Sequence, residues 1–385
     1  MKYSEFHAQL AELKQKQSYR RIQVVDSNAH LVDHGQQQLI NFSSNDYLGL
    51  AADEELQQRF FADTGIDKSH WMSASSSRAL TGTSSSHSQL EKLIAQSYNK
   101  SGALLFNSGY HANTGILPAL TSKDDLIVAD KLVHASLIDG LNLCSAKFKR
   151  YAHTDIDHLT QLLEKHRQDY RHVWIVSESL FSMDGDIAPL AELVALKEQY
   201  QCYLYIDEAH AIGCLGATGL GLAEQHDVID DIDLLVSTFG KALASCGGFV
   251  AGDEVLIQSL VNKSRSWLFS TALAPINIDW NIFIWQQLEN FLPQRKRLSE
   301  LTELFRQGLN NLNHDCLGTT YIIPLLIPGN DKVVRLANKL QNAGILAMPI
   351  RSPTVRSGSE RIRFSLTANL PEQTIRQCLE TLHEV

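Results

Sequence analysis

Polar side chains that can do chemistry follow four consecutive apolar runs in the middle of the chain. The runs are LIVA (126–129), VWIV (173–176), CYLYI (202–206) and LLVS (234–237), each with the length of a buried strand. His134 follows the first run, Asp207 the third and Lys241 the fourth. Ligands of open α/β sheets bind beyond the carboxyl ends of the strands, so we expect these side chains to meet at one edge of a sheet.

Asp207 and Lys241 together predict a cofactor that needs both a carboxylate and an amine. A lone lysine after a strand is usually a solvated surface group, but here an aspartate stands at the same place one βα unit earlier. Pyridoxal phosphate (PLP) needs an amine for its aldehyde and a carboxylate for its ring nitrogen. We therefore expect Lys241 to carry PLP as a Schiff base and Asp207 to keep the ring nitrogen protonated. The alternative role of Asp207 is a helix N-cap.

The phosphate of PLP needs hydrogen-bond donors, and a helix N-terminus provides them. Gly109 and Tyr110 lie between the apolar run ALLF (103–106) and a helical stretch, so their backbone N–H groups are the predicted phosphate site. Thr238 is predicted to add a hydroxyl donor. Thr271 is predicted to do the same, from a second subunit.

Two of the 15 histidines are chosen for their positions at the strand ends. The imidazole of His134 can stack on the pyridine ring and still donate a hydrogen bond to a substrate oxygen. His210 follows Asp207 closely and is predicted to bond the phenolic oxygen of the ring.

The surrounding elements predict an α/β fold with a large, mostly parallel sheet. Apolar runs alternate with helical periods over residues 46–285, which we interpret as a large cofactor-binding domain. Residues 1–45 hold a helical stretch and three strand-like pieces, and are interpreted as an N-terminal arm. Residues 286–385 predict a smaller α+β domain. The further strand candidates are IQVV (22–25), HLVD (30–33), QLINF (38–42), ALLF (103–106), GFVA (248–251), IIPLLI (322–327) and RIRFSLT (361–367).

Composition limits the function classes. The chain has 385 residues, 44% hydrophobic and 20% charged, with a formal net charge of −9, which is typical of a globular protein without a broad basic surface. Nucleic acid and anionic membranes are therefore not expected as partners. We expect a cytoplasmic protein, because no export signal or membrane span is evident. The six cysteines form no C-x-x-C pair, so no metal site is predicted.

Six motifs carry a resemblance to a known family: SSNDYLGL (43–50), FNSGYHAN (106–113), HASL (134–137), FSMDGDIAPL (181–190), DEAHAIGCLG (207–216) and STFGKALASCGG (237–248). Together they resemble the α-oxoamine synthases, which are fold-type I PLP-dependent transferases. The resemblance covers essentially the whole chain. It implies a homodimeric acyltransferase with a PLP-binding domain and a smaller C-terminal domain.

NFSSNDYLGL and SMDGDIAPL are similar to the branch of the family that works in biotin biosynthesis. That branch implies condensation of L-alanine with a pimeloyl thioester, releasing CO2 and the free carrier thiol. The carrier is coenzyme A or acyl carrier protein. The alternative is 2-amino-3-ketobutyrate CoA ligase (glycine C-acetyltransferase) or another α-oxoamine synthase. Two further rivals are an aminotransferase on the same fold and a non-catalytic PLP-binding regulator.

The resemblance also implies roles for particular residues. Lys241 would remove the α-proton of alanine, and His134 would polarise the acyl carbonyl. Ser182 would join His210 on the phenolate side of the ring. The substrate-binding residues would be Arg363 for the amino-acid carboxylate, Asn45, Thr354 near the acyl group, and Arg20 near its chain or distal carboxylate, with the adjacent Arg21 as the alternative to Arg20.

The chain departs from the family in one loop. Where the family often has glycines, residues 70–78 read HWMSASSSR. Serine cannot match glycine at positive φ, so a differently shaped or ordered loop is expected around 73–77.

Overall fold

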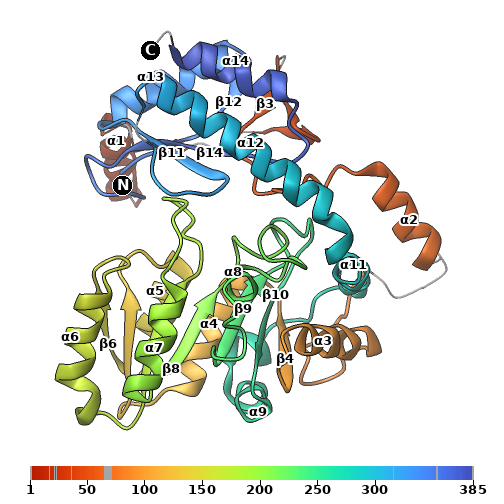
Figure 1. Cartoon of the computed structure of the whole chain (residues 1–385), viewed down its shortest axis with the longest axis vertical. Coiled ribbons are helices and arrows are strands. Elements are labelled where there is room, and N and C mark those ends of the chain that lie inside the picture. Colours follow the sequence, from red (N-terminus) through yellow and green to blue (C-terminus); the bar gives the residue numbers. More distant parts are fainter. Residues whose placement is uncertain are drawn as a thin grey trace. The chain divides into compact units, whose positions relative to one another are not determined.

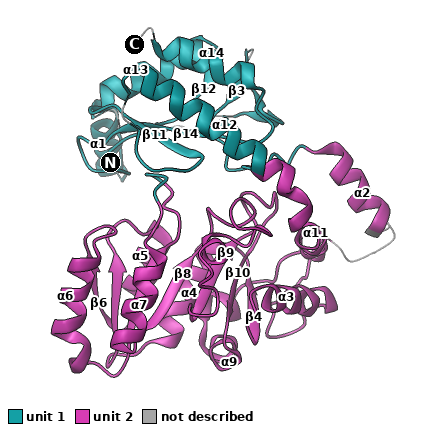
Figure 2. Cartoon of the chain, in the orientation of Figure 1, with its two compact units in different colours: residues 1–52, 183–186, 296–385 teal, residues 53–182, 187–295 magenta. Residues whose placement is uncertain are grey.

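A computed structural model describes residues 2–16, 18–20, 22, 24–35, 37–64, 72–314, 316–352 and 354–383. The chain divides into two compact units (Figure 2). Unit 1 comprises residues 1–52, 183–186 and 296–385, and unit 2 comprises residues 53–182 and 187–295. Each unit is described separately below.

Unit 2 is built on a seven-stranded, mostly parallel sheet with the order β4-β10-β9-β8-β7-β5-β6 (Figure 1). Only β10 runs antiparallel to its neighbours. The strands are β4 (Gly102–Phe106), β5 (Leu126–Asp130), β6 (Lys147–Tyr151), β7 (Val173–Glu178), β8 (Tyr203–Asp207), β9 (Leu234–Thr238) and β10 (Gly248–Gly252). The six strands predicted in this region and the mostly parallel sheet are confirmed.

The apolar runs form strands because both faces of the sheet are covered. Every residue of β4, β5, β7, β9 and β10 is buried, which favours continuous Val, Ile and Leu over an alternating pattern. The sequence analysis did not predict β6, which reads KFKRY and lies at the edge of the sheet. Charged residues are typical of an edge strand because they discourage pairing with another chain.

Helices α3 to α11 complete unit 2 together with α2. Their bounds are α2 (Glu54–Thr64), α3 (Ser85–Ser97), α4 (Gly109–Leu120), α5 (Ala135–Leu143), α6 (Ile156–His166), α7 (Leu190–Tyr200), α8 (Leu222–Gln225), α9 (Glu254–Lys263), α10 (Arg265–Leu268) and α11 (Pro275–Trp285), with short 3₁₀ turns at Arg167–Asp169 and Leu288–Phe291. Helix α4 packs on β9, β10 and α5. Gly140 of α5 allows close approach, because a Cβ there would lie 2.3 Å from the carbonyl oxygen of Asn113 in α4.

Unit 1 contains two small sheets. One has the order β1-β2-β3-β12, with β1 (Asp26–Asn28), β2 (Leu31–His34), β3 (Gln37–Asn41) and β12 (Ile345–Leu346). The other has the order β11-β14-β13, with β11 (Ile322–Leu326), β13 (Pro349–Ile350) and β14 (Arg361–Ser365). The helices are α1 (Ser4–Gln15), α13 (Asn330–Asn342), α14 (Glu372–His383) and most of α12 (Leu292–Asn311).

One predicted strand of the arm is wrong. Of the IQVV segment, Ile22, Val24 and Val25 are described and lie outside any strand, with Ile22 98% exposed. The apolar run therefore has no sheet face to cover, and the first strand begins at Asp26. The strands predicted at HLVD, QLINF, IIPLLI and RIRFSLT are present as β2, β3, β11 and β14.

The two units differ from the three predicted domains in their boundaries. Residues 46–52 group with unit 1 and residues 286–295 with unit 2. The short segment 183–186 also groups with unit 1, where the backbone carbonyl of Gly185 accepts hydrogen bonds from the backbone N–H of Thr319 (3.1 Å) and the hydroxyl of Thr320 (2.9 Å). The division into an arm and two domains stays a prediction.

No helix in the described part of the chain is both long and apolar enough to cross a membrane.

Candidate active site

A cavity of about 180 Å³ opens in unit 2 where β5, β7, β8 and β9 end and α4 begins. Seven of the residues predicted from the sequence line it, together with Ser108, Asn113, Ser136, Glu178, Ala209 and Gly240. The seven are Gly109, Tyr110, His134, Asp207, His210, Thr238 and Lys241. The structure thus brings residues from four strand ends and one helix start into a single pocket.

Lys241 lies in a tight loop that follows β9. The loop is closed by backbone hydrogen bonds from Phe239 to Gly247 (3.0 Å) and from Ser245 to Phe239 (2.9 Å). The N–H of Ala244 also donates to the carbonyl of Lys241 (2.9 Å). These bonds fix the backbone that carries the half-buried lysine at the pocket.

Asp207 ends β8 and is only 5% exposed. Its carboxylate accepts two hydrogen bonds, from the backbone N–H of Ala209 (2.9 Å) and from the side-chain amide of Asn113 (2.8 Å). A buried carboxylate held by two donors has a fixed orientation, which is what a partner for a pyridinium nitrogen requires.

His134 is the N-cap of α5 and is held as a neutral donor. Its Nδ1 accepts the backbone N–H of Ser136 (3.2 Å) and contacts the Ser136 hydroxyl (2.7 Å). The neutral ring therefore carries its proton on Nε2. Burial lowers the pKa of His134, and the nearby positive charge of Lys241 lowers it further. The negative charges of Asp207 and Asp139 act in the opposite direction.

Glu178 is a buried carboxyl group in the same lining that no sequence pattern assigned a role. It accepts a hydrogen bond from the backbone N–H of His134. Burial, reinforced by the charge of Asp207, raises the pKa of Glu178 well above its ordinary value, while the His134 N–H and Lys241 act in the opposite direction. Its place as the last residue of a buried strand is the signal that would have found it.

The N-terminus of α4 has the features of an anion site. Ser108 caps the helix by accepting the N–H of His111 (3.1 Å), and the first turn leaves backbone N–H groups without intrahelical acceptors. A Cβ at Gly248 would lie 2.6 Å from the nitrogen of Gly109, so no larger residue fits against this turn. Thr238 lies across from Gly109, where an added Cβ would be 3.4 Å from the Thr238 Cβ.

Two predicted cofactor residues are not among the described residues that line the cavity. Ser182 is the last residue of unit 2 before the segment 183–186. Thr271 is exposed, and its carbonyl accepts a hydrogen bond from the side chain of Asn107 (2.6 Å). The roles of Ser182 and Thr271 remain predictions.

In unit 1, the structure brings the predicted substrate residues Asn45 and Arg363 together. The guanidinium of Arg363, on β14, contacts the side-chain oxygen of Asn45 (3.3 Å), the hydroxyl of Tyr47 (3.3 Å) and the hydroxyl of Ser365 (2.6 Å). The turn that carries Asn45 is closed by the side chain of Asp46. Sequence reasoning missed Tyr47 as a neighbour of Arg363, although it is part of the SSNDYLGL motif.

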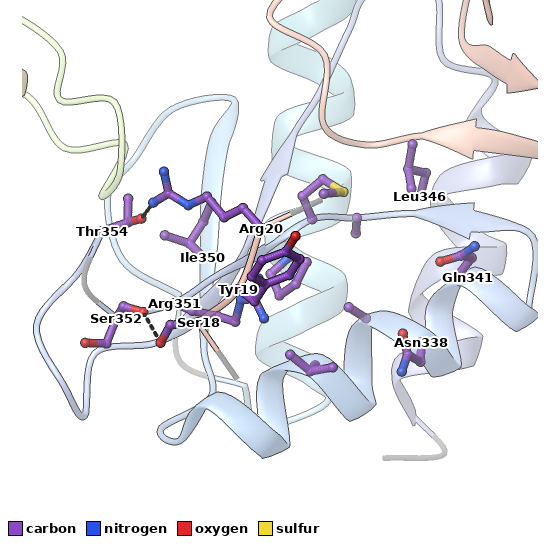
Figure 3. A pocket seen from close by; sticks show the side chains of 15 residues that line it. Ser18, Tyr19, Arg20, Asn338, Gln341, Leu346, Ile350, Arg351, Ser352 and Thr354 are labelled. Carbon is purple, nitrogen blue, oxygen red and sulfur yellow. Dashed lines mark hydrogen bonds between the residues drawn. The ribbon is translucent and has the colours of Figure 1, made fainter. Parts of the chain in front are cut away.

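Arg20 and Thr354 meet at a second cavity of unit 1, about 570 Å³ in volume (Figure 3). A guanidinium nitrogen of Arg20 donates to the Thr354 hydroxyl at 2.5 Å. Met348 and Ile350 also line this cavity, so it offers a cation beside an apolar wall. Arg21, the alternative to Arg20, lies outside the described residues.

The serine-containing loop is described from Met72 onward, while His70 and Trp71 lie outside the described residues. Ser75 adopts φ = 54°, a conformation that favours glycine. The hydroxyl of Ser73 accepts the N–H of Ser75 (3.0 Å), so local side-chain bonding supports this strained turn.

The pocket residues fit PLP rather than a metal ion. An amine, a buried carboxylate, a flat neutral imidazole and a helix N-terminus match the aldehyde, ring nitrogen, ring face and phosphate of PLP. Among the described residues, no group of three or more His, Cys, Asp or Glu side chains could hold a metal ion.

A family model described as "Aminotransferase class I and II" matches residues 37–382, so the chain belongs to this class of proteins. A solved structure of a serine palmitoyltransferase from S. paucimobilis, with a bound PLP–myriocin aldimine, has a TM-score of 0.90 at 23% identity. That comparison covers 100% of this chain and 97% of the other, and shows the fold: a fold-type I PLP-dependent transferase.

Within this class, the chain belongs to the 8-amino-7-oxononanoate synthase family. The protein of that name from Haemophilus ducreyi is 50% identical over 386 residues, covering 98% of this chain and 100% of the relative. The crystal structure of an 8-amino-7-oxononanoate synthase from Francisella tularensis has 29% identity and a TM-score of 0.74. It covers 90% of this chain and 97% of that protein.

Proposed function

We propose that this protein is a PLP-dependent acyltransferase of biotin biosynthesis. It condenses L-alanine with a pimeloyl thioester and releases 8-amino-7-oxononanoate, CO2 and the free carrier thiol. The observation that carries the proposal is that Lys241, Asp207, His134 and His210 line one pocket. The chain is also 50% identical to the 8-amino-7-oxononanoate synthase of Haemophilus ducreyi.

The residues of unit 2 hold the cofactor in this proposal. Bound PLP supplies an electron-withdrawing ring that stabilises negative charge at the α-carbon of the substrate. Asp207 pairs with the ring nitrogen and His134 lies on the ring face. The backbone N–H groups of Gly109 and Tyr110 bind the phosphate with the hydroxyl of Thr238. His210 binds the phenolic oxygen, and Ser182 joins it.

Lys241 and His134 carry the proton chemistry. The amine of Lys241 would take the proton from the α-carbon of alanine and later return a proton to the product. The Nε2–H of His134 donates to the acyl carbonyl oxygen, where negative charge develops as the new carbon–carbon bond forms. The thiol leaves, and the carboxylate of alanine leaves as CO2.

The residues of unit 1 bind the substrates. Arg363 pairs with the carboxylate of alanine, because a guanidinium presents two parallel donors to a carboxylate, and Asn45 contributes an amide beside it. Arg20 and Thr354 lie at the acyl chain, where the guanidinium suits the distal carboxylate of a pimeloyl group.

The proposal extends to the assembly and to the carrier. The enzyme is a cytoplasmic homodimer in which Thr271 of one subunit serves the phosphate site of the other. The acyl group arrives on coenzyme A or on acyl carrier protein.

The test measures CO2 released from L-alanine labelled at its carboxyl carbon, with and without pimeloyl-CoA. We expect release only when the thioester is present, and less product when glycine replaces alanine. Lys241→Ala should lower turnover at least about 1,000-fold and remove the absorbance band of the lysine Schiff base. Lys263→Ala, an exposed lysine of α9, is the matched control and should behave as wild type.

Conversion of alanine to a keto acid without CO2 release would point to an aminotransferase instead, and CO2 release without the thioester would point to an amino-acid decarboxylase. A purified protein without a cofactor band, or a Lys241→Ala protein with near-normal turnover, would overturn the proposal.

A further inference from the structure

A buried hydrogen-bond network lies behind the pocket, centred on Asn113 of α4. The residue is 2% exposed, and its side-chain nitrogen donates to a carboxylate oxygen of Asp207 (2.8 Å) and to the hydroxyl of Ser136 (2.9 Å). Its side-chain oxygen accepts from the hydroxyl of Tyr205 (2.6 Å). All the hydrogen-bonding capacity of the amide nitrogen is therefore used inside the protein.

The chemistry of the neighbours fixes which way this amide faces. The carboxylate of Asp207 accepts hydrogen bonds, as it does from the N–H of Ala209, so the NH2 group of Asn113 faces it. The oxygen of Asn113 then needs a donor, which the Tyr205 hydroxyl supplies. Tyr205 is fully buried and its pKa is raised by burial and by the charge of Asp207, so it stays a donor.

The same network reaches His134 in one direction. Nδ1 of His134 accepts the backbone N–H of Ser136, so the Ser136 hydroxyl at 2.7 Å donates to Nδ1 as well. The chain of donors runs from Tyr205 to Asn113, from Asn113 to Ser136 and from Ser136 to His134. One amide thus connects the residue predicted for the ring nitrogen with the residue predicted for the ring face.

We propose that Asn113 is a positioning residue for the cofactor: it holds the Asp207 carboxylate aimed into the pocket, and orients the Ser136 hydroxyl toward Nδ1 of His134. This inference rests on the proposed function. It goes beyond it by naming a residue that takes no part in the reaction itself but sets the state of two residues that do.

Asn113→Asp tests the proposal because it keeps the size of the side chain and exchanges the donor for an acid. Two carboxylates about 2.8 Å apart cannot both ionise at low cost, so the pair holds one proton. With that proton, the carboxyl group introduced by Asn113→Asp still donates to Asp207. Without it, repulsion disturbs the carboxylate that faces the ring nitrogen.

The measurement is the dissociation constant of PLP, by equilibrium dialysis, expressed as the ratio of variant to wild type from pH 6 to pH 9. PLP and the ionisable groups around Asp207 titrate in both proteins, so their effect on the dissociation constant cancels in the ratio. These groups are Glu178, Glu208, His134, Tyr205 and Lys241. We expect a ratio within about 3-fold at pH 6 that rises to at least about 10-fold at pH 9.

Asn99→Asp is the matched control. The exposed Asn99 also donates its amide to an aspartate, Asp230 (2.9 Å), but neither residue lines the pocket or belongs to the network. Its ratio should stay near 1 at every pH. Thermal unfolding of the cofactor-free proteins shows whether each variant folds.

Tyr205→Phe provides a second readout if Asn113→Asp does not fold. It removes only the hydroxyl that orients the amide, and should weaken PLP binding about 10-fold without a new pH dependence. A ratio for Asn113→Asp that is flat with pH overturns the inference, as does unchanged binding in Tyr205→Phe. A wild type that binds no PLP would instead overturn the proposed function.

Discussion

Glu208 is a fully buried carboxyl group next to Asp207 in the chain, and it organises the segment after β8. Its oxygens accept the hydroxyl of Ser179 (2.6 Å) and the backbone N–H groups of Leu222 (3.1 Å) and Ala223 (2.7 Å). Burial raises the pKa of Glu208 from 4.5 to about 7, despite these three donors. The folded protein therefore holds this proton more tightly than the unfolded chain does.

The pH dependence of stability follows from that difference. Below pH 4.5 the group is protonated in both states. Between 4.5 and about 7 the unfolded chain loses the proton first, so the free energy of unfolding falls with rising pH, by about 3 kcal/mol in total, and then levels off. Glu208→Gln should remove this fall, and should also destabilise the protein, because its amide NH2 faces backbone donors.

Urea unfolding at several pH values between 4.5 and 8 measures this slope. The difference in the free energy of unfolding between Glu208→Gln and wild type should change between pH 4.5 and about 7, and should be constant at higher pH. Glu192→Gln, an exposed glutamate at the start of α7, should give no such difference. A variant with the wild-type slope would show that Glu208 is ionised throughout.

His134 illustrates how burial selects a chemical role at the scale of one residue. Desolvation lowers its pKa, and the Ser136 N–H occupies Nδ1. At neutral pH the ring is therefore a hydrogen-bond donor through Nε2 rather than a cation. A neutral donor suits the polarisation of an acyl carbonyl, because it adds no second positive charge beside Lys241.

At the scale of an element, the start of α4 both begins a helix and forms the predicted phosphate site. Substitutions of Ser108 can separate these two roles. Ser108 stabilises the helix as its N-cap and lies beside the predicted phosphate site. Ser108→Ala should lower the free energy of unfolding of the cofactor-free protein by about 1 kcal/mol. Ser108→Asp keeps a good cap, so its stability should stay near wild type, while its charge should repel the phosphate of PLP.

PLP titrations and urea unfolding of both variants check this separation. We expect Ser108→Asp, the more stable of the two variants, to bind PLP about 10-fold or more weakly than wild type. If Ser108→Asp bound PLP as tightly as wild type, the phosphate would have to bind elsewhere than at α4.

At the scale of the whole molecule, the predicted cofactor residues and the predicted substrate residues belong to different units. Lys241, Asp207 and His134 lie in unit 2, and Arg363 and Asn45 lie in unit 1. Variants in the two groups should therefore have different phenotypes. Arg363→Lys keeps the charge but loses the paired donors, so the KM for alanine should rise about 10- to 100-fold.

The same Arg363→Lys protein should keep the wild-type absorbance spectrum and PLP dissociation constant. Spectra, PLP titration and alanine kinetics on one preparation measure all three quantities. Arg335→Lys, an arginine substitution in α13 of the same unit, is the control and should leave the KM unchanged. Loss of PLP from Arg363→Lys would contradict the division of roles.

The strands of the large sheet and the residues at their ends are predictable from the amino-acid sequence. Strands that are buried on both faces require continuous apolar runs, so the positions of β4, β5, β7, β8, β9 and β10 are local properties of the chain. Parallel strands place their carboxyl ends at one edge, which is why the sequence pattern is enough to pair Asp207 with Lys241. The charged edge strand β6 has no such signal.

The polar groups that surround those residues depend instead on tertiary packing. Asn113 is a helix residue that reaches Asp207 because α4 packs on the sheet and because Gly140 lets α5 approach it. Glu178 and Glu208 acquire unusual pKa values through burial, which no local pattern encodes. Hydrogen bonds and desolvation depend on neighbours distant in sequence, and those neighbours exist only once the chain has folded.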